Sequence, residues 1–183
     1  MSVRITDMAS GQTDIEGLLI ITTKQVSDER GTIREFFRAS TLSSFGTPLQ
    51  INVTETGYGA VRGLHGEATT KLVGCIAGEA FGVYLDTRPG SASYGKVVTV
   101  ELGPGTQVLV PAGVCNGFQS VSPGISQYLY CFTDEWYPGI PGTAFSPLDD
   151  GLGFSWPIPV NLSDPAMISA KDAAASKFSE QGG

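Results

Sequence analysis

Short apolar runs fill the chain between residues 15 and 135, and turn-forming residues separate them. Six of these runs follow one another at spacings of roughly 8–12 residues: KLVGCIAG, EAFGVYLDT, KVVTVELG, TQVLVPAG, CNGFQSVS and SQYLYCFTD. Glycines fall at or near the gaps, where hairpins and bulges need them. Strands at this spacing are typical of a β-sandwich or β-barrel, so the pattern predicts an all-β domain.

The flanking segments are less regular. Upstream, IEGLLIITTKQV predicts a first strand, SDERGTI a turn and a second strand, and LQINVTETGYGAVRGL a strand, a turn and a strand. REFFRASTLSSFG predicts a short helix that Ser and Thr weaken. Pro and Gly predict irregular structure from Pro138 to Pro159, and a short helix is expected after Asp172. We expect residues 1–14 to be a loose lead, residues 15–178 to form one domain and residues 179–183 to fray.

Composition narrows the class of protein. A chain of 183 residues with 41% hydrophobic and 16% charged residues is globular and long enough for one sizeable core. A net charge of −7 without a basic stripe excludes a nucleic-acid surface. The N-terminal segment is too polar for a signal peptide, and no apolar run reaches membrane-spanning length. Three cysteines without metal-like spacing read as free thiols, so a cytoplasmic protein with no membrane partner is expected.

Basic residues are unevenly spread, and five of them lie within one stretch: Arg30, Arg34, Arg38, Arg62 and Lys71. The one histidine, His65, lies in AVRGLHGE, three residues after Arg62 and six before Lys71. In one regular strand Arg62 and His65 would face opposite sides. A histidine, an arginine and a lysine so close together in an acidic protein indicate an anion-binding cleft. Small β-barrels that bind a metal usually need two or three imidazoles, so one histidine predicts metal-free acid–base chemistry.

Several motifs carry a family resemblance. AVRGLHGEATTKLV, PAGVCNGF, SQYLYCFTD and ISAKDAAA, in this order, resemble the dTDP-4-dehydrorhamnose 3,5-epimerase family, and DERGTIREFF and LQINVTET resemble its earlier segments. RGLH followed by KLV is specific, and the resemblance spans residues 15–178. It implies a cupin-type double-stranded β-helix, a jelly-roll barrel with short peripheral helices, that forms a homodimer. It also implies an epimerase without cofactor that inverts carbon 3, carbon 5 or both in a nucleotide-linked 4-keto sugar.

The resemblance assigns roles one residue at a time. It makes His65 the general base, Asp172 its carboxylate partner, Tyr130 the general acid, and Lys71 the group that binds the sugar carbonyl and its enolate. It implies that Arg62 binds the diphosphate of the substrate. The other positions that it assigns to substrate binding are Arg30, Glu35, Gln50, Asn52, Asn116 and Lys171.

These residue types suit that reaction. A proton beside a ketone can be removed when the enolate oxygen meets a cation such as Lys71. A base of near-neutral pKa removes the proton on one face, and an acid returns one on the other. An imidazole held by a carboxylate suits the first task and a positioned phenol the second. No redox cofactor is required.

Each residue also has a purely structural interpretation. Asp172 could be a helix N-cap, Tyr130 a core aromatic, Lys71 a solvated charge on an edge strand, and Arg62 half of a structural ion pair. Taken singly, none of these residues is diagnostic. The ordered set of motifs favours the catalytic interpretation.

The sequence departs from the family pattern near the substrate. Gly66 and Glu67 replace an aromatic residue and a glutamine, and the loop to Lys71 is short, which resembles a subgroup that includes GDP-linked heptose epimerases. Asn116 stands where many members have histidine, and Gly82 where many have aspartate. The substrate is therefore expected to be dTDP- or GDP-linked. Two alternatives remain open, a cupin sugar 3,4-ketoisomerase and a non-catalytic sugar-nucleotide-binding cupin, while the single histidine disfavours a metal-dependent dioxygenase.

Overall fold

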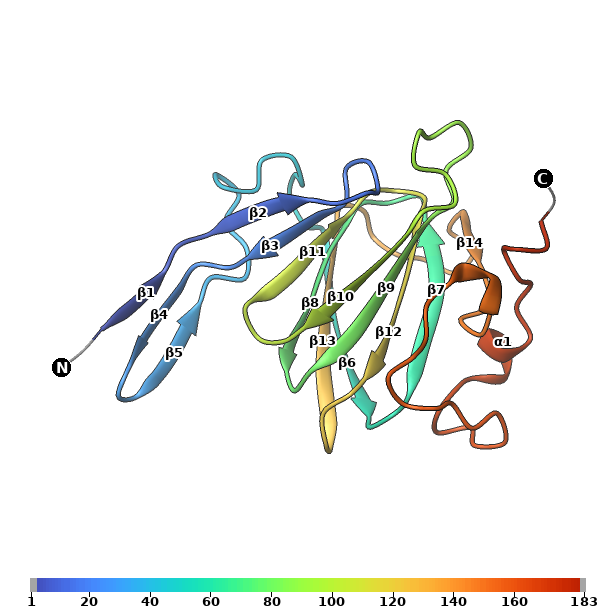
Figure 1. Cartoon of the computed structure of the whole chain (residues 1–183). Helices are drawn as coiled ribbons and strands as arrows, with labels where there is room; N and C mark the ends of the chain where they lie inside the picture. Colours follow the sequence, from blue (N-terminus) through green and yellow to red (C-terminus); the bar gives the residue numbers. More distant parts are fainter. Residues whose placement is uncertain (1–2, 182–183) are drawn as a thin grey trace.

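The computed structural model describes residues 3–181, which form three antiparallel sheets and two short helices (Figure 1). The strands are β1 (Arg4–Thr6), β2 (Ala9–Gln12), β3 (Leu19–Thr22), β4 (Gln25–Asp28), β5 (Gly31–Arg34), β6 (Gln50–Gly57), β7 (Val61–Glu67), β8 (Lys71–Ala77), β9 (Ala80–Asp86), β10 (Val97–Leu102), β11 (Thr106–Val110), β12 (Val114–Ser120), β13 (Ile125–Phe132) and β14 (Gly142–Ala144). The helices are the 3₁₀ helix η1 (Asp150–Leu152) and α1 (Ala170–Ala173). The predicted all-β class with short peripheral helices is confirmed.

Two large sheets face each other across a common interior. One has the strand order β2-β3-β11-β8-β13-β6 and the other β10-β9-β12-β7-β14, so neighbours in space are often distant in sequence. Figure 1 shows the two sheets curving toward each other as the walls of a barrel. The rings of Phe118 on β12 and Tyr128 on β13 stack across this interior with centroids 4.1 Å apart. This crossed pairing of distant strands is the predicted jelly-roll barrel.

Both sheets are also covered on their outer faces. Val73 on β8 faces the interior core, whereas its neighbour Leu72 joins an outer cluster under Leu42 and Phe45. On the other sheet, Leu64, Val83, Leu85 and Cys115 pack against the C-terminal segment through Phe145 and Leu152. Because successive side chains of a strand point to opposite faces, burial of both faces explains the continuous apolar runs in the sequence.

The six regularly spaced strands and the predicted strand, turn and strand of residues 49–64 are all observed. The helix predicted for residues 34–46 is wrong, because no helix is found there. Thr41 donates its hydroxyl to the carbonyl oxygen of Arg38 at 3.0 Å, a side-chain bond that competes with helix formation. Phe36, Phe37 and Leu42 of this segment instead pack on the outer face of the sheet.

The two ends of the chain are more ordered than predicted. The expected loose lead contains β1 and β2, which pair with β4 and β3. The single strand predicted for residues 15–26 divides into β3 and β4. Ser179 donates its backbone N–H and its hydroxyl to the carboxylate of Asp149, so the predicted fraying does not begin at residue 179. Residues 1–2 and 182–183 lie outside the described residues. Helix α1 begins at Ala170, before Asp172 rather than after it, because Ser169 is its N-cap.

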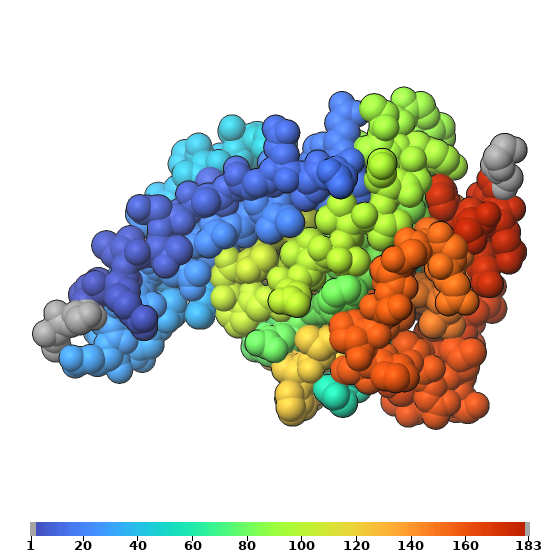
Figure 2. Space-filling view, viewed as in Figure 1, coloured from blue at the N-terminus to red at the C-terminus, as the bar shows by residue number. Residues whose placement is uncertain are grey.

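A three-stranded sheet of order β1-β4-β5 projects from the barrel (Figures 1 and 2). In the space-filling view it forms a blue extension on one side of the molecule (Figure 2). Its apolar side chains are uncovered, since Ile5 is 64% and Ile33 76% exposed. None of the helices within residues 3–181 has the length and apolar character needed to cross a membrane.

Candidate active site

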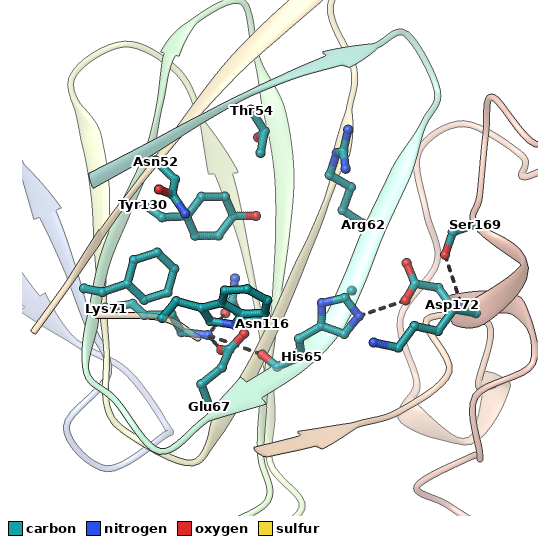
Figure 3. A pocket seen from close by; sticks show the side chains of 14 residues that line it. Asn52, Thr54, Arg62, His65, Glu67, Lys71, Asn116, Tyr130, Ser169 and Asp172 are labelled. Carbon is teal, nitrogen blue, oxygen red and sulfur yellow. Dashed lines mark hydrogen bonds and ion pairs between the residues drawn. The ribbon is translucent and has the colours of Figure 1, made fainter. Parts of the chain in front are cut away.

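A pocket of about 610 Å³ opens between the two large sheets, and its volume suits a small-molecule ligand (Figure 3). Strands β6, β8 and β13 supply one wall, and β7 and β12 supply the other. The segment after β13 and the N-terminal end of α1 close its sides. The lining residues with polar side chains or aromatic rings are Asn52, Thr54, Arg62, His65, Glu67, Lys71, Asn116, Tyr130, Phe132, Trp136, Ser169, Lys171 and Asp172.

Arg62 and His65 line this pocket together, so the opposite orientation expected for a regular strand is not found. On β12, Asn116 pairs with His65 and Phe118 with Arg62, so two steps along β12 oppose three steps along β7. The extra residue is a β-bulge, which reverses the alternation of side chains. Gly63 lies in the bulge with φ +119°, and a Cβ there would stand 2.5 Å from the Cα of Gly117. Glycine is therefore required for the two strands to approach.

His65 and Asp172 form a hydrogen-bonded pair. The Nε2 atom of His65 lies 2.8 Å from Oδ1 of Asp172, although the two residues are 107 positions apart in sequence. Burial alone raises the pKa of Asp172, but the bond and charge of His65, with bonds from Ser169 and the Gly63 backbone, lower it overall. A carboxylate only accepts hydrogen bonds, so Nε2 of His65 is the donor and Nδ1 is the nitrogen left to act as a base. Because Ser169 is the helix N-cap, the N-cap interpretation of Asp172 is wrong.

Lys71 opens β8 and is 1% exposed, so it is not a solvated charge on an edge strand. Its ammonium donates to the carboxylate of Glu67, to the side-chain oxygen of Asn116 and, at 3.3 Å, to the backbone oxygen of His65. These three acceptors match the three donors of a lysine. Lys71 is therefore held in place beside the backbone of His65.

Tyr130 lies on β13, in the sheet that faces β7, so its ring and that of His65 are on different walls (Figure 3). Its ring packs on Phe132 and Tyr128 with centroid distances of 5.9 and 4.9 Å. Burial raises the pKa of Tyr130, and the charge of Arg62 opposes that effect only in part. The phenol is consequently neutral at physiological pH and can donate a proton.

The remaining cations of the pocket have no carboxylate partner in the described part of the chain. Arg62 donates Nε to the hydroxyl of Thr56 at 2.9 Å and an NH₂ group to the carbonyl of Glu55 at 3.4 Å. Neither Arg62 nor Lys171 forms a salt bridge within residues 3–181. The ion-pair interpretation of Arg62 therefore finds no support, and both cations are available to an anion.

The structure places eight of the eleven residues assigned from the sequence in this pocket and leaves three outside it. Arg30 is in the hairpin between β4 and β5, where its side chain is 88% exposed and pairs with Asp28. Glu35 pairs with Arg38. Gln50 lies just beyond the lining, where it donates to Asn52 at 3.1 Å and accepts from the backbone of Trp136 at 2.7 Å.

Glu67 and Trp136 line the pocket but were not predicted as site residues. Glu67 follows His65 by two positions on β7, a spacing that places both on one face and that could have revealed it. Trp136 lies in an irregular segment, so no periodicity marks it. Within the described residues, no group of three or more His, Cys, Asp or Glu side chains is arranged to hold a metal ion.

Comparison with known proteins agrees with this geometry. The family model for dTDP-4-dehydrorhamnose 3,5-epimerase matches residues 12–180. The dTDP-4-dehydrorhamnose 3,5-epimerase of Salmonella typhimurium is 34% identical over 174 residues, covering 90% of this chain and 92% of that protein. The dTDP-4-dehydro-6-deoxyglucose 3-epimerase of Streptomyces bikiniensis is 31% identical over 143 residues, covering 72% of this chain and 71% of the other.

Solved structures show the same fold. The epimerase of Legionella pneumophila in complex with dTDP-4-keto-L-rhamnose has a TM-score of 0.83 and 31% identity, with 96% of this chain and 95% of that chain covered. NovW, a 4-keto-6-deoxy sugar epimerase of Streptomyces spheroides, has a TM-score of 0.85 and 26% identity, with 97% and 90% covered. These findings do not favour the ketoisomerase or the binding-cupin alternative. The chain belongs to the dTDP-4-dehydrorhamnose 3,5-epimerase family and is an isomerase of the sugar-epimerase class.

Proposed function

We propose that this chain epimerises a dTDP-linked 4-keto-6-deoxy sugar at carbon 3, carbon 5 or both, through an enolate. One observation carries the proposal: a carboxylate-held imidazole and a neutral phenol stand on different walls of one pocket, with a buried ammonium beside them. Inversion of a carbon needs a base on one face and an acid on the other, with a cation at the oxygen. The relatives act on dTDP-linked sugars, which supports that nucleotide here.

The reaction starts at the base. Nδ1 of His65 removes the proton beside the carbonyl, and the C–H electron pair forms a carbon–carbon double bond while the carbonyl π pair moves onto oxygen. Asp172 stabilises the imidazolium that results, as the aspartate carboxylate does in a catalytic triad. Lys71 faces the enolate oxygen and stabilises its negative charge.

The acid completes the inversion. Tyr130 donates a proton to the carbon from the opposite face. The electron pair of the carbon–carbon double bond forms the new C–H bond, and the pair on oxygen re-forms the carbonyl. One turnover leaves an imidazolium and a phenolate, and exchange with solvent resets both. Arg62 and Lys171 hold the diphosphate, since they are the unpaired cations of the pocket, and Asn52 supplies a neutral polar contact.

We also infer a homodimer in the cytoplasm. Strand β6 is an edge of its sheet, and Leu49, Ile51 and Val53 are 61%, 58% and 51% exposed. An exposed apolar edge strand favours pairing with a second chain. The sheet β1-β4-β5 extends away from the barrel (Figure 1), and we infer that in a dimer it reaches the partner chain. Three buried free cysteines fit a reducing compartment.

A GDP-linked 4-keto sugar is the second candidate substrate. The short loop after Glu67 supports it, because this loop resembles that of the GDP-heptose epimerase subgroup. Proton NMR in deuterated water, with dTDP-4-keto-6-deoxyglucose and a GDP-linked 4-keto sugar in parallel, tests both nucleotides. We expect loss of the signal at carbon 3, carbon 5 or both for the dTDP sugar. If neither sugar exchanged its protons with the solvent, enolate chemistry would be refuted.

A further inference from the structure

Glu67 holds a cation that the reaction depends on. Its side chain is 18% exposed and forms a salt bridge with Lys71, whose side chain is 2% exposed. Within residues 3–181 this carboxylate is the only charged partner of the ammonium, since the other two acceptors are an amide and a backbone carbonyl. A buried charge without a counter-charge is strongly unfavourable. The carboxylate therefore offsets the cost of keeping this ammonium inside the barrel.

The path of the chain places Glu67 between the base and the cation. Glu67 ends β7 two residues after His65, and Lys71 opens β8 after a link of three residues. Asn116, the third member of this cluster, pairs with His65 across the ladder between β12 and β7. His65 and Lys71 are thus held in fixed positions by strands β7, β8 and β12. Figure 3 shows Glu67 below the Lys71 ammonium and beside His65.

All three donors of Lys71 are already used, which constrains how it can meet a substrate. A substrate oxygen must therefore displace one of the three acceptors, or share an N–H donor with it. The bond to the His65 carbonyl is the long one at 3.3 Å, so it is the weakest and the first to be replaced. The bonds to Glu67 and Asn116 then remain and fix the direction of the third donor.

We propose that Glu67 is a positioning residue that holds the Lys71 ammonium in place and aims its third donor at the enolate oxygen. The inference rests on the proposed function, because it concerns the cation of that reaction. Glu67 acts through Lys71 and takes no proton from the sugar.

A double-mutant cycle in the full-length protein tests this coupling. We expect Glu67→Gln to lower kcat for deuterium exchange about 10–100-fold with little change in KM, since only the stabilisation of the enolate is lost. Lys71→Met is expected to lower kcat about 10²–10³-fold. The double variant should be no slower than Lys71→Met, because without the cation the carboxylate has nothing to hold. Glu67→Asp, which keeps the charge but is shorter, should retain more activity than Glu67→Gln.

The matched control is Glu101→Gln on the exposed face of β10, the same chemical change away from the pocket, which should leave kcat unchanged. Glu67→Gln should lower the thermal unfolding midpoint, because the buried ammonium loses its counter-charge. A circular dichroism spectrum like that of the wild type at the assay temperature excludes misfolding. Additive losses in the double variant, or full activity of Glu67→Gln, would overturn the inference.

A readout independent of turnover separates this inference from the proposed function. In protein labelled with ¹⁵N-lysine, the ammonium signal of Lys71, assigned by its loss in Lys71→Met, should be visible because the group is buried and hydrogen-bonded. It should broaden or shift in Glu67→Gln and stay unchanged in Glu101→Gln. An unchanged signal in Glu67→Gln overturns the inference even if the wild type is active. Absence of solvent exchange in the wild type, with the signal behaving as expected, overturns the proposed function and leaves the Glu67–Lys71 pair established.

Discussion

Arg62 and His65 are three residues apart on β7 and yet line the same pocket. A regular strand would place one in the pocket and the other on the opposite face. The bulge opposite Asn116 and Phe118 adds one residue to β7 and brings both side chains to one side. This places the proposed diphosphate contact and the proposed base in one cavity.

Gly63 should be indispensable to that bulge. Gly63→Ala places a Cβ 2.5 Å from the Cα of Gly117, in a backbone conformation that side chains rarely adopt. We expect a loss of about 1–3 kcal/mol in the free energy of unfolding, and a larger loss of activity because Arg62 and His65 separate. Urea unfolding and turnover measure the two effects. Gly11→Ala, where a Cβ meets nothing within 4 Å, is the control. Wild-type activity in Gly63→Ala would show that the bulge is dispensable.

The His65–Asp172 pair should carry the proton abstraction. His65→Asn removes the base and is expected to lower kcat about 10²–10⁴-fold. Asp172→Asn keeps the shape but removes the charge that stabilises the imidazolium, so a large loss is expected there as well. The double variant should be little slower than His65→Asn, because the two residues act as a unit. Solvent exchange at the sugar carbons measures all three, and full turnover of either single variant would exclude this base.

Tyr130 should be needed for inversion rather than for abstraction. In Tyr130→Phe the base can still remove a proton and return one to the same face. We expect deuterium exchange to continue while inversion falls about 10²–10⁴-fold. Comparing exchange with the stereochemistry of the recovered sugar distinguishes these outcomes. If inversion and exchange fell together, the acid and the base would not be separate residues.

Protonation of Asp86 should lower the free energy of unfolding at acidic pH. Burial raises the pKa of this carboxyl, but bonds from Arg88, Ser91 and Ser93 outweigh burial and hold the pKa far below its ordinary value. The unfolded chain has a pKa of about 3.9 there and binds more protons, so the stabilisation is present above about pH 4 and is lost as pH falls further.

Asp86→Asn is therefore expected to cost about 3 kcal/mol at pH 7, because Asp86 is fully buried and the substitution leaves Arg88 without its counter-charge. It should also flatten the loss of stability below about pH 4. Urea unfolding between pH 7 and pH 2 measures both effects. The control is Asp7→Asn, the same change at an exposed position. Parallel pH profiles for the wild type and Asp86→Asn would contradict the assignment.

The edge of β6 should control the oligomeric state. Val53→Glu puts a charge on the exposed apolar edge, and we expect it to convert a dimer to a monomer in sedimentation velocity. Thr99→Glu, on the edge strand β10 of the other sheet, should leave the dimer intact. If the wild type sediments as a monomer, the dimer inference is wrong.

The all-β class, the six evenly spaced strands and most of the pocket residues could be predicted from the amino-acid sequence alone. Strand periodicity and turn chemistry are local, and the RGLH, KLV, YLY and SAKD motifs carry the family in short segments. His65, Lys71, Tyr130 and Asp172 could be named because each lies within such a motif.

How these residues meet depends on contacts between distant parts of the chain. The contact between His65 and Asp172 spans 107 residues, and the bulge in β7 depends on its pairing with β12. The role of Glu67 depends on the same packing, because its carboxylate matters only once Lys71 is buried beside it. Residues 35–46 form turns and irregular structure rather than a helix, and the aromatic side chains of this segment pack on the outer face of the sheet. Local pattern sets which elements can form, whereas burial and pairing between distant strands set which side chains share a cavity.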